Sequence, residues 1–145
     1  MPKITIPVWR FELVREGEIT PGVKGPDQAE SLARKLIPQG ADREYFVAIY
    51  LNAKNQPIGS HMVSIGSLDS SLVHQREVLK PAILAGAYSF IVAHNHPSGD
   101  PEPSEEDITI THRLQEAGAL LGIPLLDHIV IGTGRSFSMR REGRL

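Results

Sequence analysis

The spacing of apolar and polar residues predicts strands at several points, most clearly in residues 44–68. This stretch, EYFVAIYLNAKNQPIGSHMVSIGSL, is typical of two strands joined by a turn between Asn52 and Pro57. The first strand is apolar at every position from Phe46 to Leu51. Because successive side chains point to opposite faces of a strand, we expect this one to be central and covered on both sides.

Helical spacing occurs in three segments, residues 27–37, 73–86 and 104–121. We expect Asp27 to cap the first helix and Ser104 to begin the third. In the second, Pro81 removes a backbone donor and favours a kink or a late start.

Four further strands are predicted in residues 4–15, 88–93, 123–132 and 136–140. Pro7 suggests that residues 4–15 form an edge strand, and residues 88–93 run directly into His94. Strands mixed with three helices favour one α/β domain with helices on both faces of a central sheet. A chain of 145 residues is of the right length for such a domain.

Composition narrows the function classes. The formal net charge of -2 gives no general attraction to nucleic acid or to an anionic membrane. A local exception is the C-terminal stretch GRSFSMRREGRL, which contains Arg135, Arg140, Arg141 and Arg144. These four arginines fit either a solvated surface or a phosphate-binding site. The chain has no cysteine, so disulfides, thiolate metal sites and a cysteine nucleophile are excluded. No apolar run approaches a membrane-spanning length, which predicts a cytoplasmic protein without membrane contact.

The stretch AHNHPSGDPEPSEED, residues 93–107, carries the candidate chemistry. At the end of a strand, His94 and His96 point the same way and can direct two imidazoles at one point. Zinc accepts imidazole and carboxylate, and a catalytic site needs three protein ligands with one open position. Asp107, in the first turn of the following helix, is the third candidate ligand, and the Pro- and Gly-rich run allows the required reversal.

A structural interpretation of the same residues remains open. Ser104 and Asp107 fit a capping box, in which the N-cap side chain and the residue three positions later satisfy each other's backbone N–H. That feature is common, and an isolated His-x-His is a weak metal signal. These two features and the Pro- and Gly-rich run between them, at fixed spacing directly after an apolar strand, favour the metal interpretation.

The complete pattern, His94-Asn95-His96, seven residues, then Ser104-x-x-Asp107, resembles the JAMM signature of JAB/MPN metalloproteases. The wording HNHPSGDPEPS is similar to the RadC family, as are LVHQREVLKPAI before it and LLGIPLLDHIVIG after it. The similar segments cover residues 43–145. The resemblance implies a three-layer α-β-α domain with a mixed central sheet, a bound zinc ion, and cleavage of a peptide or isopeptide amide bond.

The resemblance also implies an upstream glutamate that acts as the general base. Glu44, at the start of a central strand, fits best, and Glu77 in a helix is the competitor. Ser104 would donate a hydrogen bond to the developing oxyanion or orient the water. RadC relatives generally lack proline at position 81 and often have it at 75, which leaves the ligands unaffected. Only residues 1–43 precede Glu44, so we expect one domain without the helix-hairpin-helix module of longer relatives.

The remaining candidates are weaker. Asp127 and His128 are candidates for hydrogen-bonding to a metal ligand, and Asp100 is expected to be a turn residue. The other histidines are expected to be packing or surface residues: His61, His74 and His112. The alternative function is a DNA-repair-associated or nucleic-acid-binding module with a structural metal, for which only the arginine-rich end argues; we expect weak binding at most. A metal-free scaffold is a further alternative, but every position of the motif is present.

Overall fold

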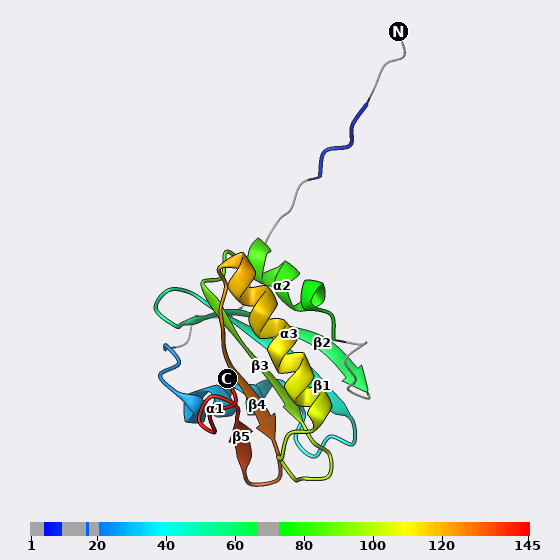
Figure 1. Cartoon of the computed structure of the whole chain (residues 1–145), viewed down its shortest axis with the longest axis vertical. Coiled ribbons are helices and arrows are strands. Elements are labelled where there is room, and N and C mark those ends of the chain that lie inside the picture. The colour runs from blue at the N-terminus through cyan, green and yellow to red at the C-terminus, as the bar shows by residue number, and fades with distance from the viewer. Residues whose placement is uncertain (1–4, 10–16, 18–20, 67–72) are drawn as a thin grey trace.

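A five-stranded mixed sheet forms the centre of the protein in a computed structural model that describes residues 5–9, 17, 21–66 and 73–145 (Figure 1). The elements follow one another as α1 (Pro26–Leu36), β1 (Glu44–Leu51), β2 (Pro57–Gly66), α2 (Gln75–Leu84), β3 (Ser89–Asn95), α3 (Glu105–Leu121), β4 (Leu125–Ile131) and β5 (Ser136–Ser138). The strand order is β2-β1-β3-β4-β5. Only β3 and β4 pair in parallel, with α3 as the crossover between them; the other pairs are antiparallel.

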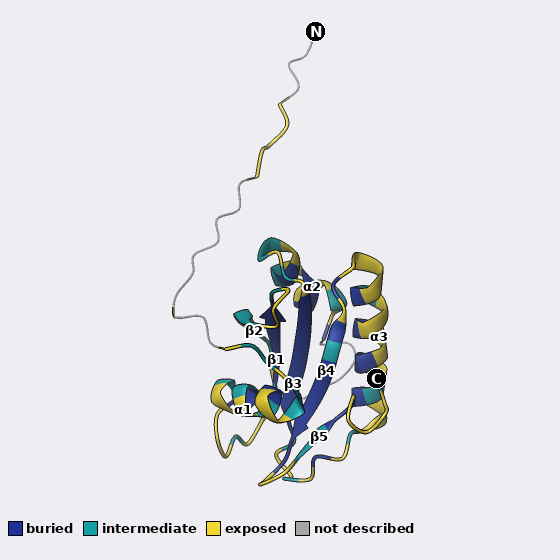
Figure 2. Ribbon diagram, turned by 90° about the vertical axis from the view of Figure 1, so that its left-hand side faces the viewer, coloured by how far each residue is buried: buried dark blue, intermediate teal, exposed yellow. Residues whose placement is uncertain are grey.

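Helices cover both faces of this sheet, which confirms the expected three layers (Figure 2). Val47, Ile49 and Leu51 of β1 pack in the cluster that includes α1, while the alternate side chains pack in the cluster that includes α2 and α3. As its apolar faces predicted, β1 lies inside the sheet, between β2 and β3. The face that carries α3 is the one on which the candidate ligands lie.

Three local predictions need correction or qualification: the strand at residues 4–15, the cap at Asp27 and the effect of Pro81. Residues 5–9 of the predicted edge strand 4–15 form no strand, and residues 4 and 10–15 lie outside the described part of the chain. Asp27 does not cap α1, because the helix begins at Pro26 with Gly25 at the N-cap. Proline suits this first helical position, since its φ is preset and its missing N–H would have no helical partner there.

Pro81 neither delays nor ends α2, which begins at Gln75 and continues past the proline to Leu84. Packing explains this tolerance, because Val78, Leu79 and Ala82 are buried in the core beside α3. None of the helices in the described ranges is both long and apolar enough to cross a bilayer.

Candidate metal centre

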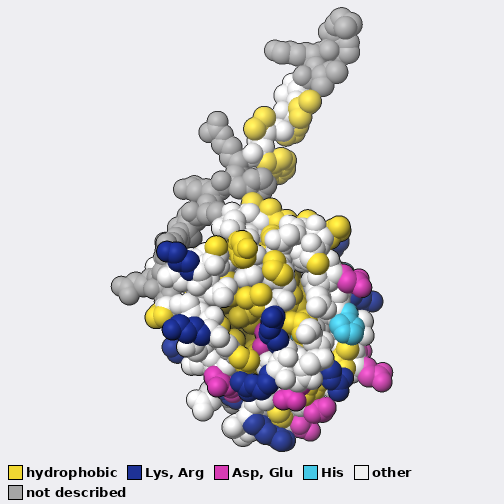
Figure 3. All heavy atoms as spheres, turned by 60° about the vertical axis from the view of Figure 1, so that its left-hand side comes forward, with side chains coloured by type: hydrophobic (Ala, Val, Ile, Leu, Met, Phe, Trp, Pro, Cys, Tyr) yellow, Lys and Arg dark blue, Asp and Glu magenta, His cyan; other side chains and the backbone are white. Residues whose placement is uncertain are grey.

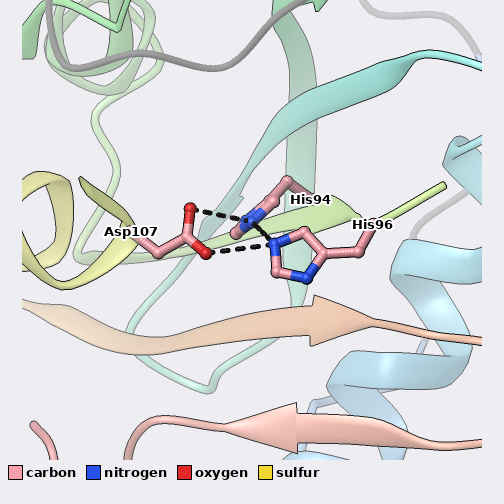
Figure 4. Close-up of side chains that lie close together, drawn as sticks. All are labelled: His94, His96 and Asp107. Atoms are coloured by element: carbon pink, nitrogen blue, oxygen red, sulfur yellow. Dashed lines mark hydrogen bonds and ion pairs between the residues drawn. The ribbon is translucent and has the colours of Figure 1, made fainter. Parts of the chain in front are cut away.

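Three side chains, from β3, from the residue that follows it and from α3, converge at the carboxyl end of β3 (Figure 4). His94 lies in β3 and His96 follows directly after it, and because they alternate along the chain both point toward α3. Asp107 approaches them from the first turn of α3. His94 and Asp107 are buried, whereas His96 is partly exposed, so the cluster reaches solvent through His96.

The distances fit a tetrahedral metal site. Nε2 of His94 lies 3.1 Å from Nε2 of His96 and 3.2 Å from Oδ1 of Asp107. Nε2 of His96 lies 3.0 Å from Oδ2 of Asp107. Zinc bonds of about 2.0–2.1 Å at tetrahedral angles require ligand atoms about 3.3 Å apart. Within the described residues, this is the group of His and acidic side chains that can hold a metal ion.

The contacts of the two Nδ1 atoms determine how the imidazoles of His94 and His96 face the candidate metal position. Nδ1 of His96 lies 2.8 Å from the backbone oxygen of Asp100, which can only accept, so this nitrogen carries the hydrogen. A neutral His96 therefore presents the lone pair of Nε2 to Asp107. Nδ1 of His94 lies 2.8 Å from Nε2 of His128, which is fully buried in β4. Lone pairs that converge in this way are stabilised by a cation.

The electrostatics of the cluster agree with a cation-binding site. The hydrogen bond to Asp107 raises the pKa of His96 above its ordinary value, although partial burial opposes the shift. Burial alone would raise the pKa of Asp107, but its contacts with the two imidazoles and the hydrogen bond from the Ser104 backbone N–H hold it well below its ordinary range. Asp107 is therefore a carboxylate at neutral pH, as a metal ligand must be.

Ser104 is the N-cap of α3, and the capping box predicted from the sequence is present. Its hydroxyl oxygen accepts from the backbone N–H of Asp107 at 3.1 Å, and Oδ2 of Asp107 accepts from the backbone N–H of Ser104 at 2.8 Å. The Asp107 carboxylate thus takes part in the N-terminal cap of α3 and also faces the two histidines. Because the Ser104 hydroxyl accepts in the cap, it keeps its own hydrogen for donation to another group.

Glu44 lies at the start of β1, beside the cluster. Phe46 pairs with His94, so the antiparallel register continued by two residues puts Glu44 opposite His96. Its charge is close enough to contribute to the raised pKa of His96. The competitor, Glu77, lies in the first turn of α2, half exposed and 3.7 Å from Arg76.

Asn95, between the two histidines, holds the start of β1 in place and was not identified from the sequence. Its side-chain oxygen accepts from the N–H of Tyr45 at 2.7 Å, and its amide nitrogen donates to the carbonyl of Arg43 at 2.9 Å. These two bonds bracket Glu44. The only sequence signal for this role of Asn95 is its position between the two candidate ligands.

The loop between His96 and Ser104 packs against the turn between β4 and β5. Gly99 has a φ of +86°, which disfavours any other residue, and an added Cβ would lie 2.6 Å from Oγ1 of Thr133. Its carbonyl accepts from the N–H of Thr133 at 2.9 Å. A Cβ at Gly132 would lie 2.4 Å from that same carbonyl. Close packing at these two glycines fixes the loop whose Asp100 carbonyl orients His96.

The weaker candidates separate clearly. His128 contacts His94, as anticipated, whereas Asp127 points elsewhere: its carboxylate accepts from the Ser138 hydroxyl at 2.6 Å and from the N–H of Arg140 at 3.1 Å. The remaining histidines are outside the cluster, in β2, at the N-cap of α2 and on the exposed side of α3: His61, His74 and His112.

A family model described as RadC-like JAB domain matches residues 23–144. A UPF0758 protein of Shouchella clausii is 48% identical over 125 residues, 86% of this chain and 54% of that protein. The UPF0758 protein YsxA of Bacillus subtilis is 57% identical over 123 residues, 85% of this chain and 53% of that protein. A UPF0758 protein of Methanosarcina acetivorans is 55% identical over 101 residues, 70% of this chain and 44% of that protein. The chain therefore spans about half the length of these curated relatives, whose names state no activity.

Proposed function

The chain belongs to the RadC-like JAB domain family, and from that membership we propose that it is a zinc-dependent hydrolase of amide bonds. His94, His96 and Asp107 would hold the ion, with Glu44 and Ser104 completing the site. The observation that carries the proposal is the convergence of two Nε2 atoms and a carboxylate at 3.0–3.2 Å, with His96 partly exposed.

A bound zinc ion would lower the pKa of a coordinated water toward about 7 and would polarise a substrate carbonyl. The protein's own groups would move the protons. Glu44 would take a proton from the attacking water on its carboxylate and return it to the leaving nitrogen. Ser104 would donate its hydroxyl hydrogen to the oxygen that becomes negative as the carbonyl is attacked.

The substrate class follows from the family resemblance, which indicates a peptide or an isopeptide-linked protein. An amide is consistent with the proposed groups, because its nitrogen is a poor leaving group until it is protonated. Glu44 would supply that proton at the second step.

The nucleic-acid alternative has less support from the described surface. Arg140 donates to the carbonyl of Leu126 at 3.1 Å, and Arg141 pairs with Asp27 at 2.7 Å. Arg135 lies 3.6 Å from Asp100. On the face shown in Figure 3, basic side chains are interspersed with acidic ones. Three of the four arginines that suggested phosphate binding, Arg135, Arg140 and Arg141, therefore already contact other groups of the protein.

The test of this proposal uses the full chain purified without chelator, and it measures zinc content together with cleavage of a panel of peptides and isopeptide-linked conjugates. We expect about one zinc per chain, and none after His96→Ala. Glu44→Gln keeps the shape of the side chain but removes the base. Its zinc content should stay near wild type while hydrolysis falls by at least about 100-fold.

Glu77→Gln is the matched control, since it makes the same change on α2 and should alter neither quantity. The assignment of the base is wrong if Glu44→Gln sheds zinc, or if Glu77→Gln keeps zinc and loses turnover. A wild-type protein that binds no zinc contradicts the proposed function itself.

A further inference from the structure

Behind His94, on the side away from Asp107 and His96, lies a buried row of polar groups from α3 and β4. Nδ1 of His94 is 2.8 Å from Nε2 of His128, and Nδ1 of His128 is 2.6 Å from Oγ1 of Thr111. The same Oγ1 is 2.7 Å from the backbone oxygen of Asp107. His128 and Thr111 are 0% and 1% exposed, so these contacts are shielded from competing water.

The direction of each hydrogen bond in this row follows from the acceptor at its end. The Asp107 carbonyl can only accept, so the single hydroxyl hydrogen of Thr111 points to it. The Thr111 oxygen is then free to accept, and Nδ1 of His128 must carry the hydrogen between them.

The same reasoning continues to the candidate ligand. His128 is fully buried, and its ring nitrogens contact His94 and Thr111 rather than a carboxylate, so a charged imidazole is disfavoured and the ring has one N–H. With the hydrogen on Nδ1, its Nε2 is an acceptor, and Nδ1 of His94 donates to it. The remaining nitrogen of His94, Nε2, keeps its lone pair and faces His96 and Asp107.

We propose that Thr111 and His128 are positioning residues that fix His94 in the tautomer whose Nε2 can bind a metal ion. The row begins at the backbone of Asp107 and ends at His94, so one candidate ligand's main chain sets the protonation of another's ring. This inference rests on the metal-binding part of the proposed function and is independent of hydrolysis.

The row of hydrogen bonds from Asp107 through Thr111 and His128 to His94 is called the relay below. Thr111→Val tests it, because valine has the shape of threonine and lacks the hydroxyl. His128 then has no acceptor for a hydrogen on Nδ1. If that hydrogen moves to Nε2, His94 is left with its own hydrogen on the nitrogen that should bind metal. We expect zinc affinity, measured by competition with a chromophoric chelator, to fall about 10- to 100-fold. Thr111→Ser keeps the hydroxyl and should bind zinc as wild type does.

Nitrogen-15 NMR of the histidine rings in the wild-type protein gives a second measurement that needs no variant. The expected spectrum has hydrogen on Nδ1 of both His94 and His128, with zinc on Nε2 of His94. The relay is overturned if His128 carries its hydrogen on Nε2, if His94 binds zinc through Nδ1, or if Thr111→Val binds zinc as tightly as Thr111→Ser. Should the wild-type protein bind no zinc, the proposed function fails, and the tautomers of the metal-free rings still decide the relay.

Discussion

At the scale of single residues, Asp107 connects helix capping to the candidate metal centre. Its Oδ2 lies 2.8 Å from the Ser104 backbone nitrogen and 3.0 Å from Nε2 of His96, while its Oδ1 faces His94. A carboxylate can serve both because it has several lone pairs. The structural and chemical interpretations of this motif therefore describe the same atoms.

The substitution Asp107→Asn distinguishes the helix-capping role of this side chain from its role as a metal ligand. The amide oxygen can still accept from the Ser104 N–H, so α3 should keep its first turn, but a neutral amide is a poor zinc ligand. We expect zinc content to fall close to zero and the helical circular dichroism to stay near wild type. Glu106→Gln, one residue earlier in the same turn, is the control and should retain zinc. Retention of zinc by Asp107→Asn would remove Asp107 from the ligand set.

Sequence reasoning reached the residues whose spacing is local and missed those that meet only through the fold. His94, His96 and Asp107 were predicted together because strand alternation and a short loop bring them close. Thr111 lies one helical turn after Asp107, a spacing that could have suggested a shared face. Its contact with His128, however, depends on the pairing of β4 beside β3, which no local pattern encodes.

At the scale of elements, α3 approaches the sheet through a glycine. Gly118 is buried, and an added Cβ would lie 2.4 Å from the backbone oxygen of Ile123 and 3.0 Å from a ring carbon of Phe90. The N–H of Ile123 donates to the Gly118 carbonyl at 2.8 Å, so the end of the helix is closed against this residue. The close approach holds α3 against the end of β3 opposite the candidate ligands.

Gly118→Ala should therefore destabilise the protein, although alanine is the better helix former. Backbone atoms cannot move aside as a flexible side chain can, and we expect a loss of about 1–3 kcal/mol in the free energy of unfolding. Chemical denaturation measures it. Gly59→Ala in β2, where no atom lies within 4 Å of the added Cβ, is the control and should change stability far less. An unchanged or raised stability of Gly118→Ala would contradict this packing.

The elements that were predicted less well depend on partners rather than on pattern. Residues 5–9 have strand-forming side chains but pair with none of the strands in the described part of the chain, and alternation alone does not form a strand. At α1, Asp27 and Pro26 are both favourable near a helix start, and the sequence does not say which backbone turn comes first. By contrast, β1 was predicted well because apolar side chains on both faces leave few other positions for it.

At the scale of the whole molecule, arginines join α1 to the C-terminal part of the chain. Arg141 pairs with Asp27 of α1 at 2.7 Å, and Arg34 of α1 donates to the carbonyls of Gly132 and Arg135 at 3.2 Å and 3.1 Å. Both contacts span about a hundred positions of sequence. These contacts join α1 to the turn that follows β4 and to the residues that follow β5.

Because these arginines are engaged and the net charge is -2, we expect only weak, sequence-independent binding to nucleic acid. Fluorescence anisotropy with several labelled duplexes, repeated over a range of salt, measures it. Affinity should be similar for all sequences, and its dependence on salt should correspond to few phosphate contacts. A strong preference for one sequence, or tight binding that persists at high salt, would favour the nucleic-acid function instead.

The antiparallel pairing of β1 with β3 has a consequence for how the site assembles during folding. His96 and Asp107 are 11 positions apart, whereas Tyr45 and Asn95, whose contact joins the start of β1 to the end of β3, are 50 apart. The entropy lost on closing a loop grows with the logarithm of its length, so the second closure, about two doublings longer, costs about 1.2 kcal/mol more. The proposed ligands are thus local in the chain and the proposed base is distant. A partly folded chain that has formed β3 and α3 but has not yet paired β1 would bring the three ligands together without the carboxylate that completes the site.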